Sequence, residues 1–152
     1  MLITAKHIQK KHAVGAVLLL GVALAALVLL VHSCSGETEK PLTCNEDRVA
    51  YLTSLGWEVE EEPLETLHLQ LPDDFTGTEY ETYNESQLAQ GFDLTSCAGR
   101  QVTRYTYCIL NHPDARTDVQ VNLYLCDGFV VAGDVIALGE NGFVAPLAYP
   151  AA

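Results

Sequence analysis

The sequence predicts an α+β protein, in which one N-terminal transmembrane helix precedes a small domain with an antiparallel sheet and two helices on one face of it. Three observations lead to this prediction. An uncharged apolar run lies near the start, two stretches of helical periodicity follow, and apolar and polar residues alternate through the last third of the chain. We expect a basic tail over residues 1–12, the span over 13–31, a linker over 32–43 and the domain over 44–149.

The run from Ala13 to Val31 contains 19 residues and no charged side chain. As a helix it would reach about 28 Å, close to the hydrocarbon thickness of a bilayer. Lys6, Lys10 and Lys11 precede the run, and basic residues mark the cytoplasmic side of a span. We therefore expect a single-pass protein of the cell membrane, with its N-terminus in the cytoplasm and its C-terminal domain outside.

Two alternatives also place the domain outside. A cleaved signal peptide would use Val31 and Ser33 as the small residues before a cut ahead of Cys34, although the apolar core of such a peptide is usually about 7–15 residues long. A lipoprotein would carry its lipid on Cys34, although His32 stands where that signal has a small residue. The sequence leaves cleavage of the segment and lipidation of Cys34 open.

The charge is concentrated outside the apolar run. The residues after it include all 20 acidic residues and five of the eight basic ones, which gives them a formal net charge of −15. A field of this sign repels phosphate backbones, so we expect no nucleic-acid partner. The negative surface either keeps the domain soluble or attracts a cation or a basic partner.

Two helices are predicted where a threonine is followed by a glutamate three positions later, the spacing of a capping box. These boxes start at Thr43 and Thr78, and the predicted helices run over residues 45–55 and 78–90. One face of the second helix consists of Tyr80, Tyr83, Gln87 and Leu88.

Short alternating runs predict the strands. Two of them, around residues 57–60 and 67–71, lie between the helices. A C-terminal three-stranded meander consists of strands over residues 104–109, 119–126 and 129–138. Asp127-Gly128 favours a two-residue type I′ turn inside this meander, because both central positions of that turn need a positive φ.

The predicted turn has one consequence for a carboxylate. Counting back from Asp127-Gly128 pairs Leu123 with Ala132 and Val121 with Asp134. Asp134 would then project onto the apolar face, where an unpaired carboxylate needs a partner or a raised pKa. Asp134 is therefore either a locally hydrogen-bonded structural residue or a functional carboxylate.

The five cysteines include no C-x-x-C pair, which argues against a thioredoxin-like site and a zinc ribbon. Across the predicted strands Cys108 lies too far from Cys126 for a bond, whereas Cys97 lies closer to it. The sequence thus leaves two alternatives, a Cys97–Cys126 disulfide or free, partly buried thiols. His68 and His112 are not placed beside any cysteine by the pattern, so no catalytic dyad is predicted.

Other catalytic motifs are missing from the sequence. It contains no G-x-S-x-G, no glycine-rich loop ending in G-K-[ST] and no D-x-D-x-D-G loop. We therefore predict no catalytic residue, no metal ligand and no cofactor, and we do not expect an enzyme.

Four segments resemble a known family. Leu55-Gly56-Trp57-Glu58-Val59 resembles its opening motif, and Gly91-Phe92-Asp93-Leu94 resembles a second block. Arg104-Tyr105-Thr106-Tyr107 is similar to one of its strands, and segments within residues 121–143 resemble its closing hairpin. The resemblance covers about residues 45–147.

This family is the domain of unknown function numbered 4830. The resemblance implies a membrane-anchored protein of a Gram-positive anaerobe, because members usually follow one N-terminal hydrophobic segment. It implies no activity, cofactor or catalytic residue. The chain has Ala132-Gly133 where two glycines are common, which weakens any inference that the backbone there approaches a ligand.

Three functions follow as hypotheses. The first is a non-catalytic domain that binds or senses an unknown protein or envelope ligand, with tyrosines either lining the binding surface or filling the core. The second is an enzyme that acts on a cell-wall or peptide substrate through carboxylates of the sheet, and the third is a redox role for the thiols. The candidate functional surface consists of Asp93, Arg104, Tyr105, Tyr107 and Asp134.

Overall fold

The computed structural model describes residues 40–139 and 141–150. The predicted tail, the predicted span over residues 13–31 and Cys34 lie outside these described residues. Within the described ranges no helix is long and apolar enough to cross a bilayer.

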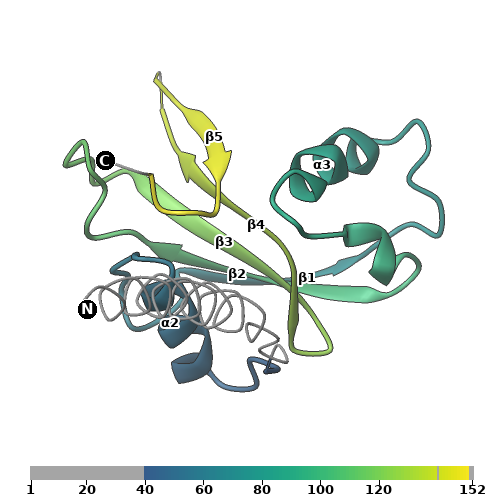
Figure 1. Ribbon diagram of the computed structural model, residues 1–152, viewed down its shortest axis with the longest axis horizontal. Coiled ribbons are helices and arrows are strands. Elements are labelled where there is room, and N and C mark those ends of the chain that lie inside the picture. The colour runs from purple at the N-terminus through teal and green to yellow at the C-terminus, as the bar shows by residue number, and fades with distance from the viewer. Residues whose placement is uncertain (1–39, 140, 151–152) are drawn as a thin grey trace, which may run out of the picture. The chain divides into compact units, whose positions relative to one another are not determined.

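A five-stranded antiparallel sheet forms the centre of the domain, with its strands side by side in chain order (Figure 1). Its strands are β1 Glu65–Gln70, β2 Gln101–Cys108, β3 Val119–Cys126, β4 Phe129–Ala137 and β5 Phe143–Pro146. The α+β class is confirmed, but the sheet has two more strands than the predicted meander. The predicted strand around Trp57 is reduced to a single bridge between Val59 and Ile109.

The first helix of the domain, α2, spans Asn45–Ser54. Its N-cap is Cys44, one residue later than the predicted Thr43. Asp47 closes the cap, because its Oδ2 accepts hydrogen bonds from the backbone N–H of Thr43 at 3.1 Å and of Cys44 at 3.4 Å. The Lys40 ammonium, together with these donors, holds the pKa of Asp47 well below its usual range.

The two helices lie on opposite faces of the sheet (Figure 1). On one face Leu52 of α2 packs with Tyr107 and Val121. On the other, the helix α3 (Glu79–Leu88) and the short 3₁₀ helix η1 (Leu94–Cys97) pack over Val102, Cys126 and Ala132. The prediction of two helices on one face was therefore wrong, because β2 and β3 send apolar side chains to both faces and each face needs a cover.

The β3–β4 hairpin turns where the sequence predicts. Asp127 and Gly128 have φ angles of 51° and 87°, so both positions are positive. Leu125 lies opposite Val130, as the two-residue turn requires.

Beyond the first pairs of the hairpin the register differs from the prediction. Val131 has no partner in β3 and forms a β-bulge, which shifts every later pair by one residue. The predicted pairing of Val121 with Asp134 was wrong for this reason, and Asp134 lies on the α3 face of the sheet. The observed pairs are Tyr124 with Ala132, Leu123 with Gly133, Asn122 with Asp134 and Val121 with Val135.

Candidate ligand-binding site

The face of the sheet that carries α3 also carries a row of polar side chains. We call these residues the polar row: Glu65 of β1, Arg104 and Thr106 of β2, Asn122 of β3 and Asp134 of β4. They share one face because side chains alternate along a strand, and because cross-strand partners such as Thr106 and Asn122 lie on the same side.

Three hydrogen bonds connect part of the polar row to α3. Thr106 Oγ1 donates to Asn122 Oδ1 at 2.7 Å, and Asn122 Nδ2 donates to Asp134 Oδ1 at 2.7 Å. Tyr83 Oη of α3 donates to Asp134 Oδ2 at 2.5 Å. Asp134 is only 4% exposed, and both of its oxygens have a donor. The need for a partner, inferred from the sequence, is thus met by Asn122 and Tyr83.

Two tyrosines stand beside this buried carboxylate. The rings of Tyr83 and Tyr124 have their centroids 5.7 Å apart. Burial, followed by the negative charge of Asp134, raises the pKa of Tyr83 and of Tyr124. Both phenols therefore remain neutral hydrogen-bonding groups at neutral pH.

Arg104 is the cation of the polar row. Its Nη2 donates to the carboxylate of Glu65, and Tyr124 is its cross-strand neighbour in β3. Its Nε is buried and has no hydrogen-bond partner among residues 40–139 and 141–150. Burial is the largest single effect and lowers the pKa of Arg104, but the interactions with Glu65 and Tyr124 together outweigh it, and the pKa is raised. In the guanidinium, Nη2 therefore has an acceptor whereas Nε has none within these ranges.

Two hollows open beside Arg104, and its side chain lines both of them. The polar hollow, with a volume of about 320 Å³, is lined by Leu64, Glu65, Arg104, Thr106, Gln120, Asn122 and Ile136. The tyrosine hollow, with a volume of about 370 Å³, is lined by Leu69, Leu71, Glu79, Tyr80, Tyr83, Leu94, Arg104 and Tyr124. One hollow therefore offers amide and hydroxyl groups, and the other offers aromatic and aliphatic walls.

The structure brings together only part of the predicted functional surface. Arg104 and Asp134 share the α3 face, two strands apart. Asp93 lies elsewhere, at the N-cap of η1, where its Oδ1 accepts hydrogen bonds from Thr95 N at 2.9 Å and Thr95 Oγ1 at 2.6 Å. The Thr95 hydroxyl holds the pKa of Asp93 below its usual range.

Tyr105 and Tyr107 lie on the opposite face, with Arg48 of α2. The Arg48 guanidinium lies 3.8 Å from the centroid of the Tyr105 ring. Arg48 Nε donates to Tyr107 Oη at 2.9 Å, and that hydroxyl donates to Asn45 Oδ1 at 2.8 Å. These groups satisfy one another, so both tyrosines hold α2 to the sheet and take no part in the hollows.

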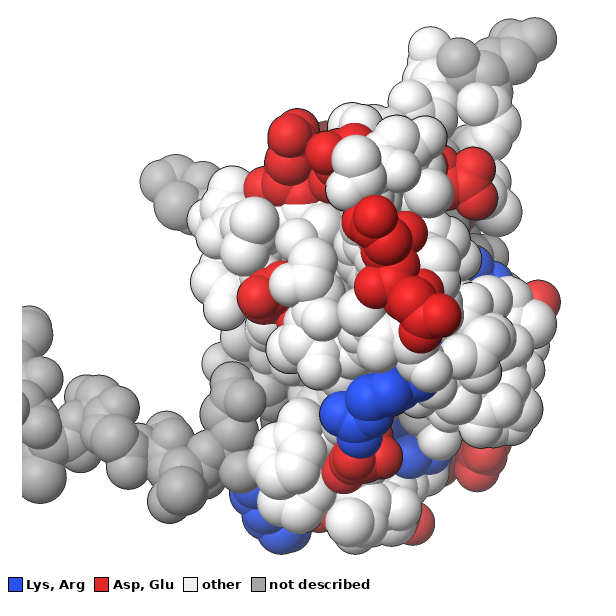
Figure 2. Space-filling model, turned by 90° about the vertical axis from the view of Figure 1, so that its right-hand side faces the viewer, with Lys and Arg blue, Asp and Glu red and all other residues white. Residues whose placement is uncertain are grey.

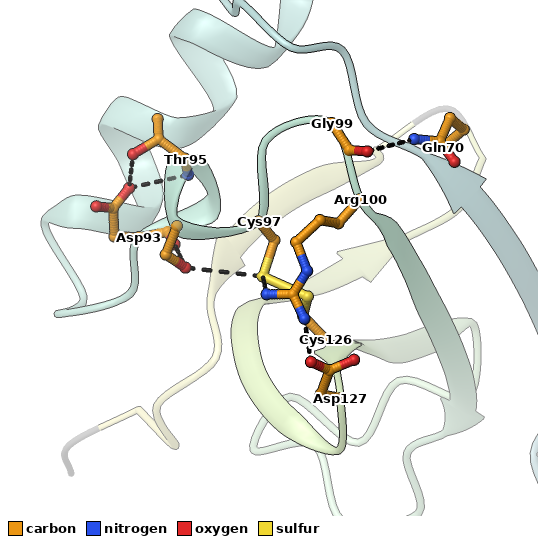
Figure 3. The surroundings of a disulfide bond; sticks show 9 residues. Gln70, Asp93, Thr95, Cys97, Gly99, Arg100, Cys126 and Asp127 are labelled. Atoms are coloured by element: carbon orange, nitrogen blue, oxygen red, sulfur yellow. Dashed lines mark hydrogen bonds and ion pairs between the residues drawn. A yellow bond between two sulfur atoms is a disulfide. The ribbon is translucent and has the colours of Figure 1, made fainter.

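A disulfide joins Cys97 of η1 to Cys126 at the end of β3, with 6.6 Å between the Cα atoms. Figure 3 shows the Arg100 side chain lying against the sulfurs and reaching Asp127 in the hairpin turn. Arg100 Nη1 lies 3.8 Å from Cys97 Sγ. The bond ties the end of the α3–η1 segment to the sheet, and therefore fixes one side of the tyrosine hollow. Of the described cysteines, Cys44 and Cys108 are free.

Sequence reasoning missed several residues of the site. Glu65, Glu79 and Gln120 line the hollows, but none has a signature that differs from that of an ordinary surface residue. The alternation of β3 was an available signal. It places Gln120 and Asn122 on the same face as Arg104 and Thr106, and the apolar residues between them on the other face. In the ranges that the structure describes, no group of His, Cys, Asp or Glu could hold a metal ion.

The comparisons with known proteins agree with the resemblance seen in the sequence. Residues 51–135, more than half of the chain, match the family model described as a domain of unknown function (DUF4830). No curated protein and no solved structure matches the chain. The resemblance is therefore confirmed at the level of the family.

Proposed function

The chain belongs to the DUF4830 family, and we propose that its domain is a non-catalytic binding or sensing module of the cell envelope. Residues 13–31 anchor it in the cell membrane as a single span, with the N-terminus in the cytoplasm and the domain outside. The ligand binds on the α3 face of the sheet, in the hollows that Arg104 lines.

The observation that carries this proposal is the position of Arg104. Its side chain lines two hollows, and its Nε is buried without a partner among the described residues. The Arg104 side chain is 26% exposed and lines both hollows, so its guanidinium offers a cation to a ligand that carries a hydrogen-bond acceptor. Small-molecule sites are typically concave and apolar, with a few polar groups that fix the orientation of the ligand.

The chemistry of the same groups supports binding over catalysis. A general base must be free to accept a proton near the working pH. Asp134 has a donor on each oxygen, and Tyr83 and Tyr124 have raised pKa values. Asp93, the other carboxylate that the enzyme hypothesis needs, caps η1 instead of joining Arg104 and Asp134.

Two further features support a position outside the cytoplasm. Disulfides persist in oxidising compartments, and Cys97–Cys126 is such a bond. Figure 2, which views the molecule from the α3 side, shows acidic side chains covering more of the surface than basic ones. A strongly negative domain stays soluble and keeps away from anionic lipid headgroups.

The orientation can be tested with the native cysteines. Cys44 is exposed and free, and residues 1–31 contain no cysteine. We expect a membrane-impermeant maleimide to label the full-length chain in intact cells, and Cys44→Ser to reduce this labelling. Labelling that appears only after the membrane is permeabilised would place the domain inside and contradict the proposed topology.

Binding can be tested with the full-length chain in nanodiscs. We expect a low-molecular-mass fraction of culture medium or digested cell wall to raise its melting temperature. Arg104→Gln should abolish the rise, whereas Arg116→Gln should keep it, because Arg116 pairs with Asp118 and lines neither hollow. If no fraction stabilises the chain, or if the active compound is consumed, the non-catalytic binding function is excluded.

A further inference from the structure

The size of the tyrosine hollow limits its ligand to a small molecule. Its volume of about 370 Å³ lies near the lower end of the range for ligand sites, about 300–1,000 Å³. Three tyrosines and three leucines form most of its wall: Leu69, Leu71, Leu94, Tyr80, Tyr83 and Tyr124. A compact apolar group, aromatic or branched, fits such a wall better than a polar one does.

The same wall carries one charge of each sign. Arg104 contributes a guanidinium, and Glu79 contributes a carboxylate from the first turn of α3. In the part of the chain that the structure describes, no hydrogen bond or ion pair engages the Glu79 side chain. A ligand with one carboxylate and one ammonium group complements both residues.

The charge of the whole domain favours a ligand without net charge. The residues after the apolar run carry a formal charge of −15, which repels a simple carboxylate as it approaches. Glu65 already occupies Nη2 of Arg104, so a second carboxylate there needs a nearby positive charge to offset the repulsion. A zwitterion carries that positive charge itself.

The volume of the tyrosine hollow, its apolar wall and its two charged residues together favour one class of ligand. We propose that the tyrosine hollow binds a free α-amino acid with a large apolar side chain. Arg104 holds the carboxylate, Glu79 holds the ammonium group and the tyrosines contact the side chain. This inference rests on the proposed binding function and gives it a ligand, so that the domain reports on free amino acids outside the cell.

Calorimetric titration of the full-length chain in nanodiscs tests the ligand class. The probes are L-phenylalanine, 3-phenylpropionate, which lacks the ammonium group, phenethylamine, which lacks the carboxylate, and L-alanine, which lacks the large side chain. We expect L-phenylalanine to bind at least about tenfold more tightly than each of the others, since each of them loses either one charge-assisted hydrogen bond or the apolar contact with the wall.

Variants then assign the two charges. Arg104→Gln should weaken L-phenylalanine binding about tenfold or more, and so should Glu79→Gln. Glu79→Gln should leave the weak binding of 3-phenylpropionate unchanged or improve it, because that probe has no ammonium group. Arg116→Gln is the matched control and should bind like the wild type. Each variant is first shown to be folded by its thermal unfolding without ligand.

Two results would overturn the ligand class. One is the failure of the folded wild-type chain to bind L-phenylalanine. The other is equal binding of L-phenylalanine by the wild type and by both charge variants. If an envelope fraction still raises the melting temperature in an Arg104-dependent way, the proposed binding function remains and only the amino-acid class is lost. If the fraction also has no effect, both proposals fail.

Discussion

Tyr83 Oη donates a 2.5 Å hydrogen bond to Asp134 Oδ2 and so joins α3 to β4 across 51 residues of the chain. The length is that of a charge-assisted O–H···O⁻ bond. Asp134 also accepts from Asn122, which links this contact to the polar row. The bond therefore positions the helix that forms one wall of the tyrosine hollow.

Removal of this hydroxyl should destabilise the domain. We expect Tyr83→Phe to lower the free energy of unfolding by about 1–3 kcal/mol, because one oxygen of a buried carboxylate loses its donor. Guanidinium unfolding followed by Trp57 fluorescence measures the change, since Trp57 is the only tryptophan and is 1% exposed. Tyr80→Phe is the matched control and should change stability less, because no hydrogen bond engages the Tyr80 hydroxyl within the part of the chain that the structure describes. Equal effects of the two variants would show that the Asp134 contact adds no stability.

The raised pKa values predict weakening of the fold at alkaline pH. Tyr83, Tyr107 and Tyr124 have pKa values above the ordinary value of 10.0 in the folded chain, chiefly through burial. Their contribution is fully present below pH 10.0 and is lost as the pH rises toward the folded pKa values, because the unfolded chain releases these protons first. We expect unfolding free energies to fall above that pH, and to fall less steeply in Tyr83→Phe. Absorbance titration of phenolate provides the check, since these three tyrosines should ionise at a higher pH in the folded chain than in the unfolded one.

The disulfide should contribute a large share of the stability. Cys97 and Cys126 are separated by 29 residues, and closing a loop of this length stabilises a fold by about 2–4 kcal/mol. Reduction, or Cys97→Ser, should lower unfolding free energy by that amount, whereas Cys44→Ser should have a small effect because Cys44 is exposed. Intact mass after thiol alkylation, with and without reductant, tests the bond directly. A purified chain whose cysteines never change oxidation state under envelope conditions would also argue against a redox role.

Gly133 should not tolerate a side chain. A Cβ at this position would lie 2.6 Å from Leu147 Cδ2 and 3.2 Å from the backbone oxygen of Asn122. We expect Gly133→Ala to cost about 1–3 kcal/mol by overpacking. Val144→Ala, at a site 73% exposed, should change stability little in the same unfolding assay. A neutral Gly133→Ala would mean that Leu147 moves aside without loss, and would contradict the close packing of β4.

Local patterns predicted the elements well. The helix over residues 45–55 corresponds to α2, and the strands over 119–126 and 129–138 correspond to β3 and β4. These segments have short-range signals, a cap or an alternating run, that do not depend on distant residues. The turn at Asp127-Gly128 belongs to the same class, because its positive φ angles are a local requirement.

Relationships between distant segments were harder to predict. Which face each helix covers depends on apolar residues of β2 and β3 that point both ways, and alternation alone does not assign a helix to a face. The hollows depend on Glu65, Glu79 and Arg104, which come together from β1, α3 and β2. A single sequence does not show which residues of distant segments contact one another. Arg104 could therefore be predicted as a candidate, but the residues around it could not.

The bulge at Val131 decides which core receives the carboxylate of β4. Side chains alternate along a strand, so one extra residue reverses the odd–even order of everything after it. With Val131 in place, Asp134 faces Tyr83 and Asn122, while Val135 joins the apolar layer under α2. If Val131 instead paired with Tyr124 and formed no bulge, Asp134 would lie opposite Val121 on the side of Leu52 and Trp57, and Val135 would turn to the α3 face. The number of residues between the turn and Asp134 thus decides which face of the sheet the carboxylate occupies, independently of the identity of any neighbouring side chain.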